Sequence, residues 1–410
     1  MSTTVYLHEE EIKSLKSNSN DQGHAVEGVA FSMDNNTVIH AYLNTPIVLP
    51  SGRVIPCKFI VFPSSEVLAQ VEKEIGKFIS ELKDEFFLVV LSSVDSPIYK
   101  SYLLTKDQIT ESKVKLVPRR SELYSRSKGL LETDTLAKKK VGIVGLGSGG
   151  SPIAIELAKA GIGKFVLIDF DRIELTNVAR HICGINDLGR LKTFAVRDAI
   201  LQKNPYAEIS CLEIDVNKHR EECASALSKV DLIMCASDND QSRFFLNEIA
   251  LKYKVPTIFG RAITRAIGGD VLRVRPYVGP CYSCLYSQNV RQEGSDDEEI
   301  SQEEQAKKML PDYTSEQEIK TVIQVGLASD IAPISNFMVK LALVELSKGL
   351  ESGIKSLEED LVADFYIWAN RRENVYESWN KLEFNFNKPS ILRWYGAKIN
   401  KDPNCMVCGL

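Results

Sequence analysis

The chain has 410 residues, more than one hydrophobic core usually serves, so two or more domains are expected. Its formal net charge of -5 argues against nucleic acid as a partner. The N-terminus lacks the basic and apolar regions of a signal peptide, and no apolar run approaches the roughly 18 residues of a membrane span, so we expect a cytoplasmic protein without a membrane partner.

Residues 1–118 are expected to form a smaller N-terminal domain, α/β or α+β in class and unassigned in role. Strands are predicted at 26–31, 38–43, 57–62 and 86–91, and a helical pattern covers 65–82. Cys57 and His24 are lone candidates for chemistry, and a structural role is favoured for both. The stretch 106–139 is charged and mostly polar, with helical character at 121–136, and we take 119–139 as a linker and lead-in helix.

The segment KVGIVGLGSGG at 140–150 predicts a buried strand that runs into a glycine-rich turn. The glycines of its G-x-G-x-x-G pattern are Gly145, Gly147 and Gly150. Such a turn suits a nucleotide phosphate at a helix N-terminus, although it can also be purely structural. A helix predicted at 151–160 and a strand at 164–169 favour the first interpretation, because the strand ends in Asp169, where an acid would meet a ribose hydroxyl.

Strands and helices continue to alternate beyond Asp169. Helices are predicted at 190–204, 218–227 and 242–253, and strands at 209–214, 230–235 and 256–259. This alternation predicts an α/β fold with a doubly wound, mostly parallel Rossmann-like sheet over 140–410. The acidic stretch 294–308 is expected to be a mobile connection, and 331–350 a long apolar helix that packs on the core or on a second subunit.

Two C-x-x-C pairs predict a metal site. Their residues are Cys281, Cys284, Cys405 and Cys408. Four thiolates satisfy a closed tetrahedral zinc site, which would fasten the C-terminus to the body and would be structural, because it leaves no position for water. The alternative is two separate redox pairs.

Several motifs together resemble those of the ThiF, MoeB and ubiquitin-activating adenylyltransferases. These motifs are GLGSGG at 145–150, DFDRIELTNVARH at 169–181, GRLK at 189–192, SDND at 237–240 and the two C-x-x-C pairs. The resemblance covers roughly residues 120 to 410. It implies a ThiF/MoeB-type fold that uses Mg-ATP to adenylate a C-terminal carboxylate, and it implies zinc at the four cysteines.

The resemblance also implies roles for single residues. Asp169 would hold the ATP ribose, Asn177, Arg180 and Lys192 would face the triphosphate, and Asp238 would hold Mg²⁺. Arg126, in LYSRS, matches an arginine that reaches the ATP of a partner subunit, which implies a homodimer. One departure is His181, because the family often has Gln there, and this leaves substrate contact at that position open.

The residue types suit this chemistry without reference to a family. A carboxylate that attacks the α-phosphate adds negative charge to an anionic triphosphate, and arginine, lysine and a magnesium-bound aspartate offset it. No general base is needed, because the carboxylate is ionised at neutral pH. The alternatives are that Asp238 is a helix N-cap and that Arg180 and Lys192 are solvated surface charges.

No cysteine occurs between Leu285 and Asn404, where many relatives carry the one that forms a thioester. The corresponding segment offers only Thr321, Ser329 and Ser335, and Cys183 and Cys235 are expected to be packed. We therefore expect the chemistry of this chain to end at adenylation, with a conjugating enzyme, a sulfur donor or a group on the substrate as acceptor.

Three hypotheses remain at this stage. The first is adenylation of the C-terminus of a ubiquitin-like protein. The second is adenylation of a short peptide, as in the microcin-maturing MccB enzymes, which also carry an N-terminal extension. The third is a catalytically inactive scaffold, against which Arg180, Lys192 and Asp238 argue together.

Overall fold

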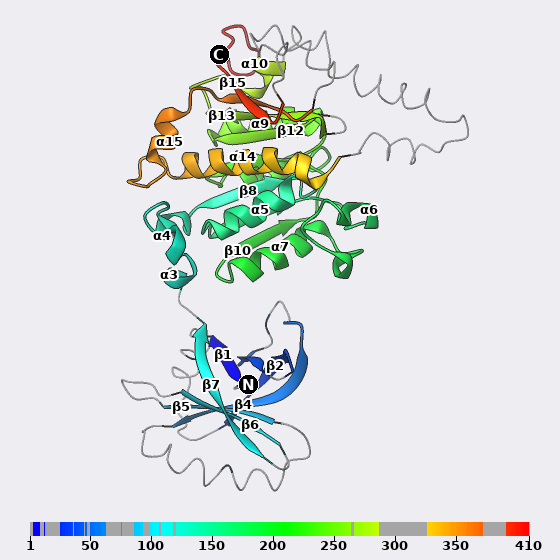
Figure 1. The fold of residues 1–410 in the computed structure, drawn as a ribbon. Helices are drawn as coiled ribbons and strands as arrows, with labels where there is room; N and C mark the ends of the chain where they lie inside the picture. The colour runs from blue at the N-terminus through cyan, green and yellow to red at the C-terminus, as the bar shows by residue number, and fades with distance from the viewer. Residues whose placement is uncertain are drawn as a thin grey trace, which may run out of the picture. The chain divides into compact units, whose positions relative to one another are not determined.

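The computed structural model describes residues 3–8, 12, 25–35, 37–44, 46, 50–62, 75, 86–92, 99–105, 108–117, 120–263, 266–286, 326–371 and 391–409. The chain divides into two compact units, an N-terminal unit (Met1–Ser125) and a C-terminal unit (Arg126–Leu410) (Figure 1). His24 and the acidic stretch 294–308 lie outside the described residues.

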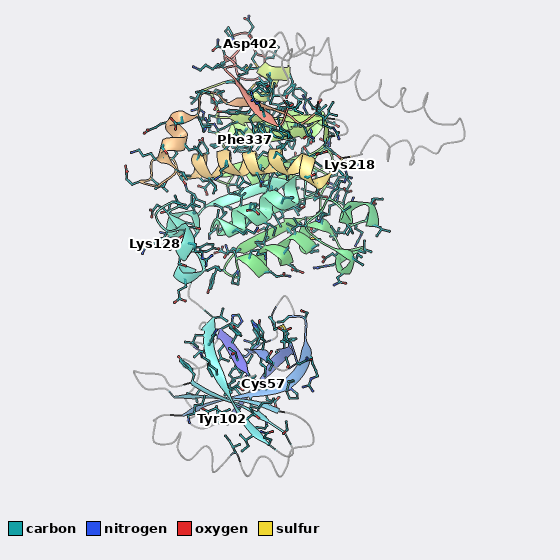
Figure 2. The ribbon with its side chains drawn as sticks, viewed as in Figure 1. Cys57, Tyr102, Lys128, Lys218, Phe337 and Asp402 are labelled. Carbon is teal, nitrogen blue, oxygen red and sulfur yellow. The ribbon has the colours of Figure 1, made fainter. Side chains whose placement is uncertain are left out.

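The N-terminal unit is built on a sheet that closes on itself, in the order β1-β3-β2-β4-β5-β6-β7. Its strands are β1 (Thr4–His8), β2 (Ala25–Met33), β3 (Val38–Tyr42), β4 (Arg53–Phe62), β5 (Phe86–Ser92), β6 (Tyr99–Leu104) and β7 (Ile109–Val117). Parallel pairing of β1 with β7 closes the sheet, and buried side chains from alternate positions fill its interior. Cys57 lies in this interior, 2% exposed, so a structural role fits it (Figure 2).

Two features before residue 140 differ from the sequence-based expectations. Residues 109–117 form β7, a strand that was not predicted, because exposed charges at every second position obscure its half-buried side (Glu111, Lys113 and Lys115). The single helix predicted at 121–136 is broken into α3 (Arg120–Leu123), a 3-10 turn at Ser125–Ser127 and α4 (Thr133–Leu136), and Gly129 between them has φ +87°. The helical pattern at 65–82 lies outside the described residues, except for Ile75, which is helical and buried.

The C-terminal unit contains one sheet in the order β10-β9-β8-β11-β12-β13-β14-β15. Its strands are β8 (Lys140–Val144), β9 (Lys164–Ile168), β10 (Glu208–Leu212), β11 (Leu232–Cys235), β12 (Thr257–Ala262), β13 (Gly268–Val274), β14 (Phe365–Ala369) and β15 (Arg393–Ala397). The first five strands in this order are parallel and the last three are antiparallel. The predicted mostly parallel sheet is confirmed, while β13, β14 and β15 were not predicted.

Helices cover both faces of this sheet, which confirms the doubly wound architecture (Figure 1). One face is covered by α5 (Gly150–Lys159), α7 (Lys192–Lys203) and α14 (Ala328–Leu346), and the other by α8 (Arg220–Leu227), α9 (Asp240–Tyr253) and α10 (Tyr282–Tyr286). The expected apolar helix is α14, which buries Ile334, Met338 and Leu341 against the core. Among the described residues no helix is long and apolar enough to cross a membrane.

Candidate functional site

The candidate residues follow three neighbouring parallel strands of the C-terminal unit. The glycine turn follows β8, Asp169 follows β9, and Asp238 lies in the loop between β11 and α9. Since β8 lies between β9 and β11, the carboxyl ends of all three meet at one edge of the sheet. The chain runs from β8 towards β9 on one side and later returns to β11 on the other, and ligands bind at such a switch point in doubly wound sheets.

The glycine turn leaves room beside the N-terminus of α5. Gly145 has φ +82°, and a Cβ there would lie 2.7 Å from the carbonyl oxygen of Ala236. A Cβ on Gly150 would overlap the carbonyl oxygen of Gly145. The close approach of α5 to the turn therefore requires glycine at this position. At Gly147 a Cβ would meet no heavy atom within 4 Å. This open space is where an anion could approach the backbone.

The peptide groups of Leu146 fasten the glycine turn to two site residues. The Leu146 N–H donates to Oδ2 of Asp169 (2.6 Å), and its carbonyl oxygen contacts Nε2 of His181 (2.7 Å). Because the Cys183 N–H donates to Nδ1 of His181 (3.0 Å), the ring proton lies on Nε2 and is donated to Leu146. Burial lowers the pKa of His181, which favours this neutral form. The residue that departs from the family pattern therefore supports the turn.

Asp169 is half-buried and Lys192 is buried, and the charge of Lys192 acts on the Asp169 carboxyl. Burial raises the pKa of the Asp169 carboxyl, and the Lys192 ammonium and the backbone N–H groups of Leu146 and Asp171 oppose that rise. Lys192, the first residue of α7, is only 8% exposed, and its Nζ lies 2.7 Å from Oδ2 of Asp171. Lys192 is thus not a solvated surface charge. Its partner Asp171 was missed in the sequence, although it lies within the DFD of the motif.

Asn177 and Arg180 belong to one short turn. Asn177 is in α6 (Leu175–Val178), where its Oδ1 accepts a hydrogen bond from the Glu174 N–H (3.1 Å). The Arg180 N–H donates to the Asn177 carbonyl oxygen (2.8 Å), and the Arg180 side chain is half-buried. The turn leads directly into His181, so its position relative to the glycine turn depends on the His181–Leu146 hydrogen bond.

Asp238 is not a helix cap. The N-cap of α9 is Asn239, whose Oδ1 accepts a hydrogen bond from the Ser242 N–H (2.9 Å). Asp238 is exposed and forms no hydrogen bond or ion pair with the described residues. Its carboxylate is therefore available for a cation.

Arg126 lies in the exposed 3-10 turn before α4, and among the described residues it forms no ion pair. In Figure 1, α4 lies at the opposite side of the C-terminal unit from α6. In the part of the chain that the structure describes, no hydrogen bond or ion pair joins Arg126 to another candidate residue.

The four cysteines of the C-x-x-C pairs come together as a cluster. All their Sγ atoms lie within 4.8 Å of one another, with separations of 3.8 Å (Cys281–Cys284), 3.7 Å (Cys281–Cys405) and 3.3 Å (Cys284–Cys408). A tetrahedral site with Zn–S bonds near 2.3 Å has edges of about 3.8 Å, so the donor set fits a metal of that kind. Burial raises the pKa of the Cys281 thiol to about 11, so a bound cation would be needed to hold it as thiolate at neutral pH.

The other five cysteines are poor nucleophiles. Burial raises the pKa of Cys183 and Cys223 to about 12 and that of Cys211 to about 11, and it also raises the pKa of Cys57 and Cys235. Ser335, one of the hydroxyls in the segment where a nucleophile was sought, is 2% exposed and donates to the Gly149 carbonyl oxygen (3.1 Å). Ser335 therefore supports the glycine turn through this hydrogen bond, a role that was not predicted from the sequence. Ser329 lies in the first turn of α14, and Thr321 lies outside the described residues.

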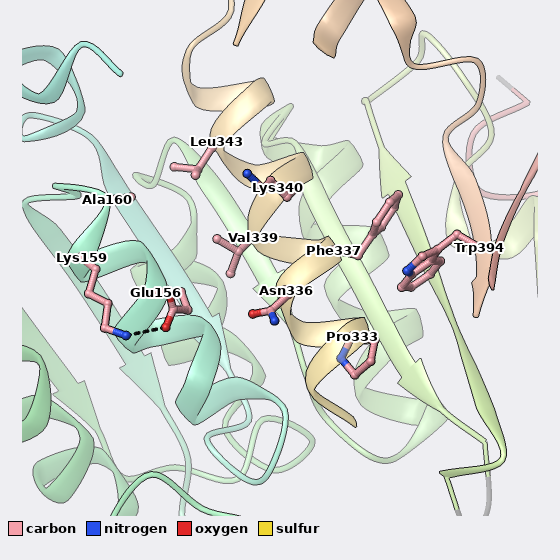
Figure 3. Close-up of a pocket in the computed structure, with 10 residues that line it drawn as sticks. All are labelled: Glu156, Lys159, Ala160, Pro333, Asn336, Phe337, Val339, Lys340, Leu343 and Trp394. Carbon is pink, nitrogen blue, oxygen red and sulfur yellow. Dashed lines mark hydrogen bonds and ion pairs between the residues drawn. The ribbon is translucent and has the colours of Figure 1, made fainter. Parts of the chain in front are cut away.

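A groove of about 580 Å³ lies away from these residues, between α5 and α14 (Figure 3). Its lining includes Glu156 and Lys159 from α5, Phe337 from α14 and Trp394 from β15. The rings of Phe337 and Trp394 are stacked at 4.2 Å between centroids. None of the candidate site residues lines this groove.

Comparison with known proteins gives consistent matches. Residues 121–379, more than half of the chain, match the model of the ThiF family. Adenylyltransferase and sulfurtransferase MOCS3 from Drosophila willistoni is 34% identical over 154 residues, 37% of this chain and 33% of the relative. Ubiquitin-like modifier-activating enzyme 5 from Caenorhabditis elegans is 27% identical over 164 residues, 38% of this chain and 39% of the relative. The matches thus span about a third of the length of these relatives.

Among solved structures, MccB from E. coli superimposes with a TM-score of 0.51 at 19% identity, covering 71% of this chain and 73% of that chain. MccB with selenomethionine MccA has the same TM-score and identity, with coverages of 72% and 76%. At this identity the likeness concerns the fold alone.

Proposed function

The chain belongs to the ThiF family, and from this premise we propose that it uses Mg-ATP to adenylate the C-terminal carboxylate of a ubiquitin-like protein. In this reaction a carboxylate oxygen bonds to the α-phosphorus of ATP, the bond from that phosphorus to the bridging oxygen breaks, and pyrophosphate leaves with the electron pair. The products are the acyl-adenylate and pyrophosphate. The proposal is supported by relatives whose names include adenylyltransferase and ubiquitin-like modifier activation.

One observation carries the proposal. The open glycine turn, the half-buried Asp169 and the carboxylate of Asp238, which has no partner among the described residues, follow three adjacent parallel strands. In the proposed complex the phosphates lie at Gly147 and the N-terminus of α5, Asp169 accepts from the ribose hydroxyls, and Asp238 binds Mg²⁺. An inactive scaffold would have no need to keep this combination.

The cations would act as electrostatic stabilisers. Arg180 presents a planar set of donors suited to phosphate oxygens, and Lys192 contributes a point charge already placed at the start of α7. Asn177 would orient the same phosphates as a neutral donor. Because these groups are positioned before substrate arrives, little reorganisation is needed when charge builds up on the triphosphate.

We further propose that this chain forms no thioester of its own. The five cysteines outside the cluster all have raised pKa values, and each is buried or half-buried. The acyl-adenylate would then pass to a separate acceptor, such as a conjugating enzyme. The four-cysteine cluster is assigned to structural Zn²⁺, with no part in the chemistry because it is closed.

The proposal is tested by ATP–pyrophosphate exchange with purified protein and size-fractionated lysate from its source cells. We expect exchange that depends on a protein-sized fraction, whose active component mass spectrometry can name. Exchange that follows only the peptide fraction would favour the second candidate, adenylation of a short peptide C-terminus. No exchange with any fraction, from folded protein with metal bound, would leave the inactive scaffold as the remaining function.

A homodimer with Arg126 acting across the interface is also proposed, and mixing of two inactive variants tests it. Arg126→Ala and Asp238→Ala are each expected to lack exchange activity. In a heterodimer of the two, one site would combine an intact Asp238 with the partner's intact arginine. Co-expression in equal amounts should restore about a quarter of wild-type activity, because half of the dimers are mixed and each has one complete site. Failure to restore activity in isolated heterodimers would contradict action in trans.

A further inference from the structure

We infer that Tyr282 is a positioning residue, which connects the cysteine cluster to the loop that carries Asp238. The inference rests on the proposed function, in which Asp238 binds Mg²⁺. It assigns a task to a tyrosine that lies between two cluster cysteines, Cys281 and Cys284, and that contacts no substrate itself.

The loop around Asp238 is held on both sides by α9. On one side, the Ser237 carbonyl oxygen accepts from Nη2 of Arg243 (2.8 Å), and the Ser237 Oγ accepts from the Ser242 Oγ (2.6 Å). On the other side, Oδ1 of Asn239 accepts from the Ser242 N–H (2.9 Å) and from Nδ2 of Asn217 (3.2 Å). Asp238 is thus the one exposed acid between two residues whose positions are determined by hydrogen bonds.

Arg243, which supports one side of this loop, depends on Asp240. Arg243 is 6% exposed, and its Nη1 lies 2.9 Å from Oδ1 of Asp240. This ion pair keeps Arg243 directed at the Ser237 carbonyl oxygen.

Tyr282 connects the Asp240–Arg243 pair to the cysteine cluster. Its hydroxyl donates to the same Oδ1 of Asp240 (2.9 Å), and the residue is 2% exposed. Its backbone N–H donates to Oδ1 of Asn247 (2.9 Å), and Nδ2 of Asn247 contacts the Ser283 Oγ (3.3 Å). Helix α9 is therefore fastened to the C-x-x-C turn at two points two helical turns apart, and the first of them is next to the Asp238 loop.

The experiment compares Tyr282→Phe with Tyr286→Phe. Both tyrosines lie in α10, both are nearly buried, and each donates one hydroxyl to a buried or half-buried aspartate at 2.9 Å. The Tyr286 hydroxyl meets Asp270, which pairs with Arg261 in the sheet and not with the loop. Tyr286→Phe is thus matched in chemistry and burial but does not touch the Asp240–Arg243 pair.

Binding of ATP is measured by calorimetry in metal-depleted buffer, with and without added Mg²⁺, together with thermal midpoint and zinc content. We expect Tyr282→Phe to weaken ATP binding in the presence of Mg²⁺ by roughly fivefold, a change typical of coupling between sites. Without Mg²⁺, its ATP affinity should stay within about twofold of the wild-type value. Tyr286→Phe should leave both values near wild type, and both variants should keep one zinc per chain.

Other outcomes separate the inference from the function beneath it. An equal Mg²⁺-dependent loss of ATP affinity in the two variants, or no loss in Tyr282→Phe, would overturn the positioning role of Tyr282. The proposed function would still stand in that case if the wild type binds ATP with Mg²⁺. ATP binding by the wild type that is absent or insensitive to Mg²⁺ would overturn the proposed function, and the inference with it.

Discussion

Asp238→Ala is expected to lower ATP–pyrophosphate exchange by roughly 100-fold or more, because it removes the carboxylate that would hold Mg²⁺ beside the phosphates. The side chain is exposed and forms no hydrogen bond or ion pair with the described residues, so its loss should leave the thermal midpoint within about 2 °C. Exchange rates are measured at saturating ATP over a range of Mg²⁺ concentrations, with circular dichroism as the check of folding.

Asp360→Ala serves as the matched control for that variant. It removes an exposed carboxylate from α15 (Lys355–Asp360), outside the site, and should leave exchange unchanged. Wild-type exchange by a folded Asp238→Ala protein would remove Asp238 from the proposed metal site. A loss of folding is not expected, because Asn239 and not Asp238 caps α9.

Cys405→Ser is expected to lower the thermal midpoint by about 10 °C and to release the metal, because structural zinc contributes directly to folding. Cys405 and Cys408 lie in the same hydrophobic cluster as α9 and α10, so the cluster attaches the last residues of the chain to that core. Zinc content is measured by mass spectrometry of metals in the purified protein, and stability by differential scanning fluorimetry.

Cys211→Ser is the control for the cluster variant. Cys211 is half-buried outside the cluster, and its Sγ approaches the Thr193 carbonyl oxygen (3.6 Å), a contact that a serine hydroxyl can also make. This variant should keep its zinc and lose little stability. One zinc per chain in Cys405→Ser, at wild-type stability, would show that the four cysteines are not the metal site.

Much of the C-terminal unit could be predicted from the sequence, because its signals are local. The apolar run at β8, the glycine turn and the start of α5 occupy consecutive residues, and short connections force each following strand to lie parallel to the last. The repeated C-x-x-C spacing likewise predicted a shared metal site, because two cysteines separated by two residues can place both sulfurs on one metal. Residue types and spacing therefore determined the fold class and the candidate residues.

Only the tertiary structure decided how these residues support one another. The hydrogen bonds Asp169–Leu146, His181–Leu146 and Tyr282–Asp240 join positions 23, 35 and 42 residues apart. The periodicity of apolar residues in the sequence does not predict contacts at such separations. For the same reason β14 and β15 were missed, since antiparallel partners that follow long connections have no local signature. Closure of the N-terminal sheet depends on pairing of its first and last strands, which is set by the packed interior and not by either strand alone.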